Sequence, residues 1–158
     1  MKINIATSEN EYKECFEFIK KLWKDEFEIN FELNLEKQYQ SFIKSNIYFI
    51  KENSKIISII QLAKVKKWFK TKEWIIPKKD CYFLWRIWVL NTYRNKWYWT
   101  NLINFWLNKI KQEWIKLIYL SSEINNIDYY YKFWFRKISN KERKIWNTSA
   151  VYMENNLF

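Results

Sequence analysis

The chain contains no glycine and no histidine, and its 158 residues include only one proline and two cysteines. The absence of histidine excludes histidine-based catalytic triads, and two cysteines are too few soft ligands for an ordinary zinc site, so we expect no metal. Cys15 and Cys81 lack the C-x-x-C spacing of redox and metal motifs. We therefore expect both to be buried, reduced thiols.

Long apolar runs are also missing. No stretch approaches the ~20 apolar residues of a membrane span, and the N-terminus lacks the apolar core of a signal peptide. We expect a cytoplasmic protein without membrane association, formed by one domain over residues 1–158, as a monomer or homodimer. The net charge of +11 suits a polyanionic partner, although solvated surface lysines would also explain much of it.

The chain has about as many tryptophans as the glycines that would be expected in it. An average composition of about 7% glycine predicts roughly 11 glycines in a chain of this length. The chain has 11 tryptophans instead. Lys, Asn and Ile dominate its composition, which is typical of an AT-rich genome.

Hydrophobic periodicity predicts helices over 9–24, 35–44, 97–113 and 125–133, and strands over 2–6, 47–51, 55–65, 81–90, 115–120, 135–138 and 150–154. Ser8 and Glu11 have the spacing of a capping box at the start of the first helix. Residues 52–54, Glu-Asn-Ser, suit a tight turn between two strands.

The stretch from Tyr82 to Leu102 organises the rest of the chain. It reads as an apolar strand, a basic turn that carries Arg94 and Lys96, and an amphipathic helix. Backbone N–H groups at a helix start point outwards, and the helix dipole favours negative charge there. This stretch therefore predicts an anion site.

With tryptophan read as glycine, the same stretch resembles the acetyl-CoA-binding strand, loop and helix of the GNAT acyltransferase superfamily. Arg94, Trp97 and Trp99 sit on the three defined positions of the family's pyrophosphate motif, Q/R-x-x-G-x-G/A. The segment Y-Y-Y-K-F-W-F resembles the family's F-Y-x-K-x-G-F, with Trp134 in place of glycine. Trp114 stands at a helix C′ position, where glycine supplies a left-handed turn. The tail V-Y-M-E-N-N-L resembles the closing strand of the ElaA-like branch.

This resemblance implies an α/β (α+β) GNAT fold, with a mixed, mostly antiparallel central sheet that is flanked by helices and splayed between the fourth and fifth strands. It also implies an N-acetyltransferase that moves an acetyl group from acetyl-CoA to a primary amine by direct attack. Backbone groups of the central strand would bond the pantetheine arm, and the loop after it would hold the pyrophosphate. By position, these residues are Ile87, Trp88 and Val89 for the arm and Arg94, Asn95, Lys96, Trp97, Tyr98, Trp99 and Thr100 for the pyrophosphate. A core strand and a solvated loop without any ligand would show the same pattern.

Tyr130 falls on the family's tyrosine, which protonates the departing CoA thiolate, although Tyr129 and Tyr131 lie one residue away. The first choice for the general base is Glu123, which could equally be a helix-capping residue, and a chain of waters could replace it. Glu73 is a distant second.

The resemblance also makes three residues of the joining loop candidate acceptor contacts, where they could equally cover the sheet: Phe27, Phe31 and Glu32.

Two alternatives to a simple acetyltransferase stay open. The charge and the many aromatic side chains would suit a non-enzymatic basic nucleic-acid-binding domain. A GNAT enzyme acting on aminoacyl-tRNA would reconcile the charge with the fold. In every case the acceptor is open, and indoles at Trp97 and Trp99 would crowd a phosphate site, so the chain as written could keep the fold and be impaired as an enzyme.

We hypothesise that most or all of the tryptophans stand where the functional protein has glycine. A UGA codon that the source organism reads as glycine would produce this pattern. Peptide mass spectrometry of the protein from its native host is expected to find glycine at the positions of Trp97, Trp99 and Trp134. Tryptophan at these three positions would end the hypothesis.

Overall fold

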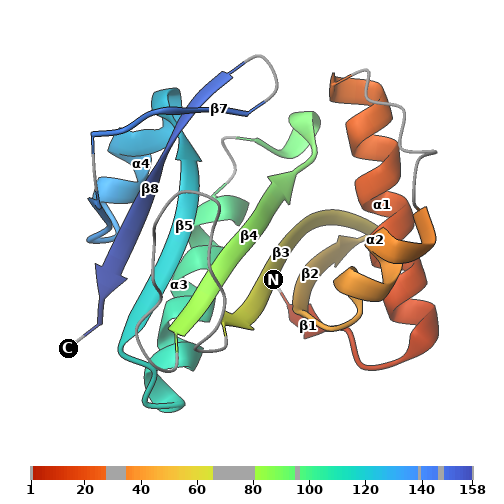
Figure 1. The fold of residues 1–158 in the computed structure, drawn as a ribbon. Coiled ribbons are helices and arrows are strands. Elements are labelled where there is room, and N and C mark those ends of the chain that lie inside the picture. Colours follow the sequence, from red (N-terminus) through yellow and green to blue (C-terminus); the bar gives the residue numbers. More distant parts are fainter. Residues whose placement is uncertain are drawn as a thin grey trace. The chain divides into compact units, whose positions relative to one another are not determined.

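The computed structural model describes residues 2–27, 35–65, 81–94, 97–138, 140–145 and 148–157 (Figure 1). In chain order the elements, with 3-10 helices labelled η, are β1 (Ile3–Ile5), α1 (Glu9–Phe27), α2 (Leu35–Phe42), β2 (Asn46–Glu52), β3 (Lys55–Val65), β4 (Cys81–Val89), η1 (Asn91–Tyr93), α3 (Tyr98–Gln112), β5 (Leu117–Glu123), η2 (Ile124–Asn126), α4 (Ile127–Tyr131), β6 (Arg136–Lys137), β7 (Arg143–Ile145) and β8 (Thr148–Asn156).

The strands form one mixed sheet in the order β1-β2-β3-β4-β5-β8-β6, with β7 also paired to β8. The pairing of β4 with β5 is parallel, whereas the other pairings whose register is described are antiparallel. The register between β4 and β5 runs from Cys81↔Leu117 only to Leu84↔Leu120, although both strands continue. The predicted α+β architecture, with a sheet that splays between the fourth and fifth strands, is confirmed.

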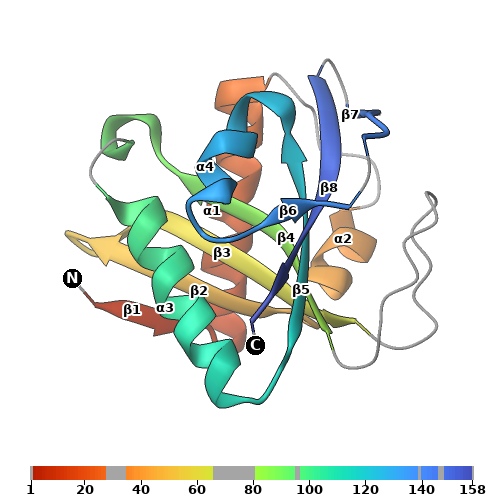
Figure 2. The same ribbon diagram turned by 90° about the vertical axis from the view of Figure 1, so that its left-hand side faces the viewer.

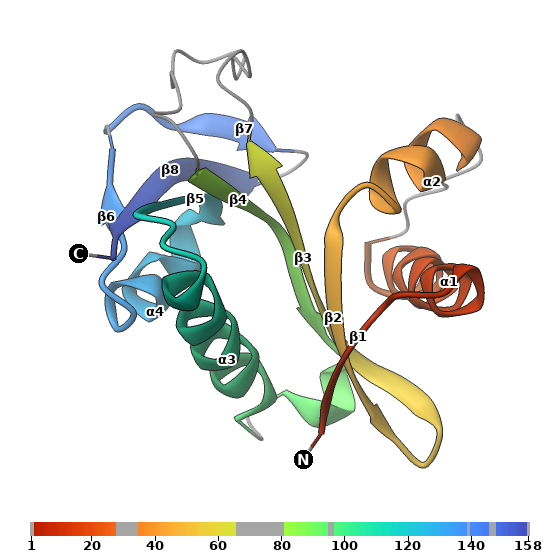
Figure 3. The ribbon, with the colours of Figure 1, turned by 90° about the horizontal axis from the view of Figure 1, so that it is seen from below.

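The chain divides into two compact units, and the first comprises Met1–Leu62 and Arg86–Trp106. Its helices α1 and α2 lie on the same face of β1 and β2 (Figure 3). Apolar side chains recur at helical spacing along α1 and are buried there, among them Phe16, Ile19 and Trp23. The predicted capping box is present, because Ser8 N–H donates to Glu11 Oε2 (3.0 Å) and Glu11 N–H donates to Ser8 Oγ (3.3 Å).

The second unit comprises Ala63–Trp85 and Leu107–Phe158. Its centre is the antiparallel pair of β5 and β8, with α4 beside them (Figure 2). The Asn155 side-chain amide donates to the Phe133 carbonyl (2.6 Å) and so ties β8 to the turn after α4. The division into units does not test the expectation of one domain, which stays a prediction.

Some predicted boundaries were wrong. Strand β7 was not predicted, because a three-residue strand is too short to show an alternating pattern. The helix predicted over 125–133 is η2 followed by a five-residue α4. On α3, Leu102, Ile103 and Trp106 are buried, whereas Phe105 is 38% exposed, with its ring 5.8 Å from that of Tyr48.

Five described residues have φ in the left-handed region, although none of them is glycine: Asn53 (49°), Ser54 (62°), Trp97 (65°), Trp114 (58°) and Trp134 (65°). Asn53 and Ser54 form the two-residue tip of the β2–β3 hairpin, where a type I′ turn requires positive φ at both positions. The predicted turn is confirmed. Positive φ at tryptophan is a genuine outlier, because a bulky side chain clashes with its own backbone there.

Trp114 ends α3 in a Schellman motif. Its N–H donates to the Lys111 carbonyl (3.1 Å), and the N–H of Ile115 donates to the Ile110 carbonyl (3.4 Å). This pair of bonds requires a left-handed residue at C′, which is usually glycine. The indole of Trp114 is 81% exposed, so packing against the protein compensates little of its backbone strain.

Trp134 occupies the same position after α4. Its N–H donates to the Tyr131 carbonyl (3.0 Å), and the N–H of Phe135 donates to the Tyr130 carbonyl (3.3 Å). The rings of Tyr130 and Phe135 meet edge to face at 5.8 Å, which is the apolar contact that commonly accompanies this motif. Trp134 is 79% exposed.

Single replacements of Trp97, Trp114 and Trp134 by glycine are each expected to raise the free energy of unfolding by about 1 kcal/mol. The left-handed conformation costs a residue with a side chain about 1–2 kcal/mol, and the extra freedom of unfolded glycine offsets part of the gain. Urea unfolding followed by circular dichroism measures the change.

The matched control is Trp85→Gly, since Trp85 is 47% exposed but lies within β4 outside the positive-φ region. This replacement is expected to lower the free energy of unfolding by about 0.5–1 kcal/mol, because glycine weakens a strand. An equal gain from the control would contradict the backbone explanation.

Candidate functional site

The start of α3 has the geometry of an anion site. The carbonyl of Trp97 accepts the N–H of Asn101 (2.9 Å), so Trp97 is the residue from which the helix starts. Tyr98, Trp99 and Thr100 form the first turn, whose N–H groups point out of the helix end. This turn contains no acidic residue. The positive end of the helix dipole is therefore not offset by a carboxylate within the turn.

Trp97 and Trp99, both matched above to glycine positions, differ in conformation. Trp97 is left-handed at φ 65° and its side chain is 74% exposed. Trp99 lies within the helix, outside the positive-φ region, and is half-buried. Positive φ therefore explains a glycine at position 97 only. At position 99 the remaining physical reason for glycine is close approach of a ligand to the backbone.

Arg94 closes the turn that precedes this helix. Its Nε donates to the carbonyl of Val89 (3.1 Å), the last residue of β4. Its backbone N–H donates to the Asn91 carbonyl (3.1 Å). The guanidinium is thereby held beside the strand end. Asn95 and Lys96, which were also predicted to contact the pyrophosphate, lie outside the described residues.

Glu52 is a neighbour of this helix that sequence reasoning missed. The Tyr98 hydroxyl donates to Glu52 Oε1 (3.3 Å), and the Tyr93 ring stands edge to face against Tyr98 at 5.8 Å. The hydrogen bond that Tyr93 donates to Glu52 raises the pKa of Tyr93, while burial and then Glu52 raise the pKa of Tyr98. Glu52 ends β2, far away in sequence, so no local pattern could have indicated this contact.

Ile87, Trp88 and Val89 lie beyond the last residue pair that β4 forms with β5. Ile87 and Val89 are buried. The side chain of Trp88 points to the face of β4 opposite to that of Ile87 and Val89. It packs against the core cluster that includes α1, with its ring 5.2 Å from that of Trp23. The position of the three residues after the paired part of β4 agrees with the predicted role of their backbone, which stays a prediction.

The three adjacent tyrosines differ in burial. Tyr130 is only 5% exposed, Tyr129 is half-buried, and Tyr131 is 44% exposed. Burial raises the pKa of Tyr130, and Tyr129 and Glu123 add to the shift. Because the folded protein holds this proton more tightly than the unfolded chain, the shift contributes stability that is complete below a pH of about 10 and is lost at higher pH.

Glu123 lies close enough to Tyr130 for its charge to act on the phenol, so the structure brings the candidate acid and base together in one unit. Glu123 precedes η2 in the N-cap position, yet its side chain forms no capping hydrogen bond. Side-chain capping therefore does not account for this residue. Glu73, Phe31 and Glu32 lie outside the described residues, and Phe27 is the last residue of α1.

Other sequence expectations concern thiols, metals and membranes. Cys15 and Cys81 are buried and form no disulfide, as predicted, and burial raises the pKa of Cys15 to about 12. Within the described ranges, no three histidine, cysteine or acidic residues gather as metal ligands would. In the same part of the chain, every helix is too short or too polar to cross a bilayer.

The sequence pattern of the acetyltransferase (GNAT) family matches residues 9–135. The fold is similar to that of a putative N-acetyltransferase from Lactobacillus plantarum (TM-score 0.74, 12% identity), with 99% of this chain and 98% of that chain covered. It is also similar to the ribosomal-protein-S18-alanine N-acetyltransferase from Escherichia coli (0.71, 12% identity, 99% and 94% covered). A third similar structure is the PaiA N-acetyltransferase from Thermoplasma acidophilum in complex with coenzyme A (0.64, 19% identity, 99% of each covered). No curated protein matches the sequence of the chain.

Proposed function

Because this chain belongs to the acetyltransferase (GNAT) family, we propose that it moves an acetyl group from acetyl-CoA to a primary amine. The observation that carries the proposal is the start of α3, where a left-handed residue opens a helix turn without acidic side chains. Such a turn favours a diphosphate, which acetyl-CoA contains. The resemblance of the tail to the ElaA-like branch suggests the subfamily, and a cytoplasmic location stays part of the proposal.

In this proposal the amides of Tyr98, Trp99 and Thr100 bind the pyrophosphate, and Arg94, Asn95 and Lys96 complete the loop. Backbone groups of Ile87, Trp88 and Val89 orient the pantetheine arm. The amine attacks the thioester carbonyl directly, so no covalent enzyme intermediate forms. Positioning of the two substrates and stabilisation of the oxyanion supply most of the rate enhancement.

Glu123 is the proposed base for the attacking amine, and Tyr130 is the proposed acid for the departing CoA thiolate. The phenol of Tyr130 is protonated at neutral pH, as a general acid must be, and Glu123 is near enough to act on its pKa. The Schellman motif at Trp134 supports it further: the Phe135 N–H bonds to the Tyr130 carbonyl and fixes the end of α4.

The glycine hypothesis is part of the same proposal. Three of the positions matched to family glycines are left-handed, and their indoles are 74–81% exposed at Trp97, Trp114 and Trp134. An exposed indole contributes little packing energy at a left-handed position, whereas glycine adopts this conformation without strain. With tryptophan at positions 97 and 99, we expect the chain to keep its fold and to bind acetyl-CoA poorly.

Isothermal titration calorimetry with acetyl-CoA tests the donor site. The double variant Trp97→Gly/Trp99→Gly is expected to bind at least about tenfold more tightly than the chain as written, because two indoles leave the diphosphate site. Trp114→Gly is the matched control, since it relieves the same backbone strain at the opposite end of α3, and it should leave the affinity unchanged. Absence of binding by all three proteins would favour the nucleic-acid-binding alternative, which the charge of +11 supports.

The replacement Tyr130→Phe tests the general acid in the glycine-containing protein. We expect kcat to fall about 100-fold or more, since general acid catalysis contributes on that order. The affinity for acetyl-CoA should change less than about twofold, because the hydroxyl acts on the leaving group in the transition state. Tyr131→Phe, which removes an exposed hydroxyl from the same helix, is the control. Equal losses of turnover and affinity in Tyr130→Phe would contradict the assignment.

A further inference from the structure

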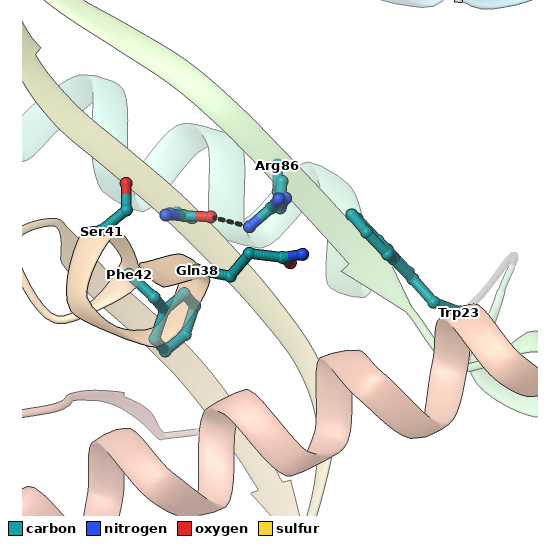
Figure 4. Close-up of a pocket in the computed structure, with 6 residues that line it drawn as sticks. Trp23, Gln38, Ser41, Phe42 and Arg86 are labelled. Atoms are coloured by element: carbon teal, nitrogen blue, oxygen red, sulfur yellow. Dashed lines mark hydrogen bonds between the residues drawn. The ribbon is translucent and has the colours of Figure 1, made fainter. Parts of the chain in front are cut away.

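A cavity of about 310 Å³ lies within the first unit and is unused by the donor site described above. It is lined by Trp23 of α1, Gln38, Ser41 and Phe42 of α2, Gln61 of β3, and Arg86 of β4. Figure 4 shows the side chain of Gln38 extending from α2 towards Arg86. The volume is at the lower end of the range for small-molecule sites, roughly 300–1,000 Å³, and so fits a small ligand.

Among the described residues that line the cavity, Arg86 is the only charged one. Its Nη1 donates to Gln61 Oε1 (3.0 Å), and its guanidinium stands over the rings of Trp23 (4.8 Å) and Trp88 (5.6 Å). Gln61 is 4% exposed, and its Nε2 donates to Ser45 Oγ (3.0 Å), which fixes the amide with its oxygen towards Arg86. A polar chain of three side chains therefore holds the guanidinium in one orientation.

This cation has no carboxylate partner among the described residues. The ion pairs described there all join lysine to glutamate: Lys13 to Glu9, Lys20 to Glu17, and Lys51 to Glu14. Burial lowers the pKa of Arg86 to about 10, yet the group is still a cation at neutral pH. A guanidinium has five N–H donors, and an amide oxygen occupies one of them. Because Arg86 is partly buried, an anion with two oxygens would stabilise its charge.

We propose that the cavity binds the carboxylate of the amine acceptor, with Arg86 as its counter-ion. This inference rests on the proposed acetyl transfer and names its acceptor class as a small amine that carries a carboxylate, such as an amino acid. A planar carboxylate matches the planar guanidinium fork. The described lining residues supply one positive charge and are otherwise neutral, which balances a carboxylate and leaves a phosphate dianion uncompensated.

The inference does not depend on the identity of residue 23. Arg86, Gln61 and Ser45 include no tryptophan, and their hydrogen bonds would persist with glycine at positions 23 and 88. Glycine at position 23 would remove one lining side chain and so enlarge the cavity, which Arg86 would still line.

The first test measures binding without acetyl-CoA. Nuclear magnetic resonance follows the Arg86 side-chain Nε–H signal while a panel of amino acids and their primary amides is titrated into the full chain. At least one free amino acid is expected to shift this signal and saturate, with affinity about 10- to 100-fold higher than that of its amide. Equal effects of acids and amides, or no effect of either, would overturn the inference whatever the donor chemistry.

The second test measures acetyl transfer to the same panel, with every variant made in the Trp97→Gly/Trp99→Gly protein. Arg86→Met is expected to lower kcat/KM for the preferred amino acid about 10- to 100-fold. The kcat/KM for the amide of that amino acid should change less than about twofold. Arg86→Lys keeps the charge but loses the planar fork of the guanidinium. Its kcat/KM for the amino acid should lie between those of Arg86→Met and of the protein with Arg86. Arg136→Met, on an exposed residue of β6, is the matched control. Equal losses for acid and amide in Arg86→Met would mean a structural role for Arg86 and would overturn the inference.

Acetyl-CoA calorimetry separates this inference from the proposed function. Normal acetyl-CoA binding by Arg86→Met, together with loss of transfer to the acid alone, supports both. An Arg86 signal that responds to free acids in a Trp97→Gly/Trp99→Gly protein with no affinity for acetyl-CoA supports the anion cavity and overturns acetyl transfer.

Discussion

Three left-handed backbone positions fix the ends of the helices on which the candidate site depends. Trp97 starts α3, Trp114 ends it, and Trp134 ends α4. At Trp114 and Trp134 the hydrogen-bond pattern requires this conformation, because a right-handed residue could not return the next N–H to the preceding turn. All three positions adopt the left-handed conformation although tryptophan is poorly suited to it.

The turns at Trp97 and Trp134 also orient groups to which the proposed mechanism assigns a role. The turn at Trp134 directs the Phe135 N–H to the carbonyl of Tyr130, the buried tyrosine of α4. The turn at Trp97 sets the direction in which the first amides of α3 point. A change at either position would act on the site through the main chain, and the exposed indoles themselves contribute little packing.

The net charge of the protein acts over a long range, whereas Arg86 acts by direct contact. The net charge of +11 attracts anions in general and gives no specificity. Arg86 can be specific, because Gln61 holds its guanidinium in one orientation and because partial burial increases the benefit of pairing the cation with an anion. A long-range field that gathers anions and one oriented cation that selects a carboxylate would work together in acceptor binding.

The sequence by itself determined the features that local chemistry records: the Ser8 and Glu11 capping box, the bounds of β3, and the glycine-like places of Trp114 and Trp134. Each depends on residues within a few positions of one another, so a pattern in the chain reveals it. Tertiary structure alone decided which of the adjacent tyrosines is buried, that Glu52 meets Tyr98, and that Gln61 holds Arg86. These contacts join residues of different elements, and only the folding of the sheet and helices brings them together.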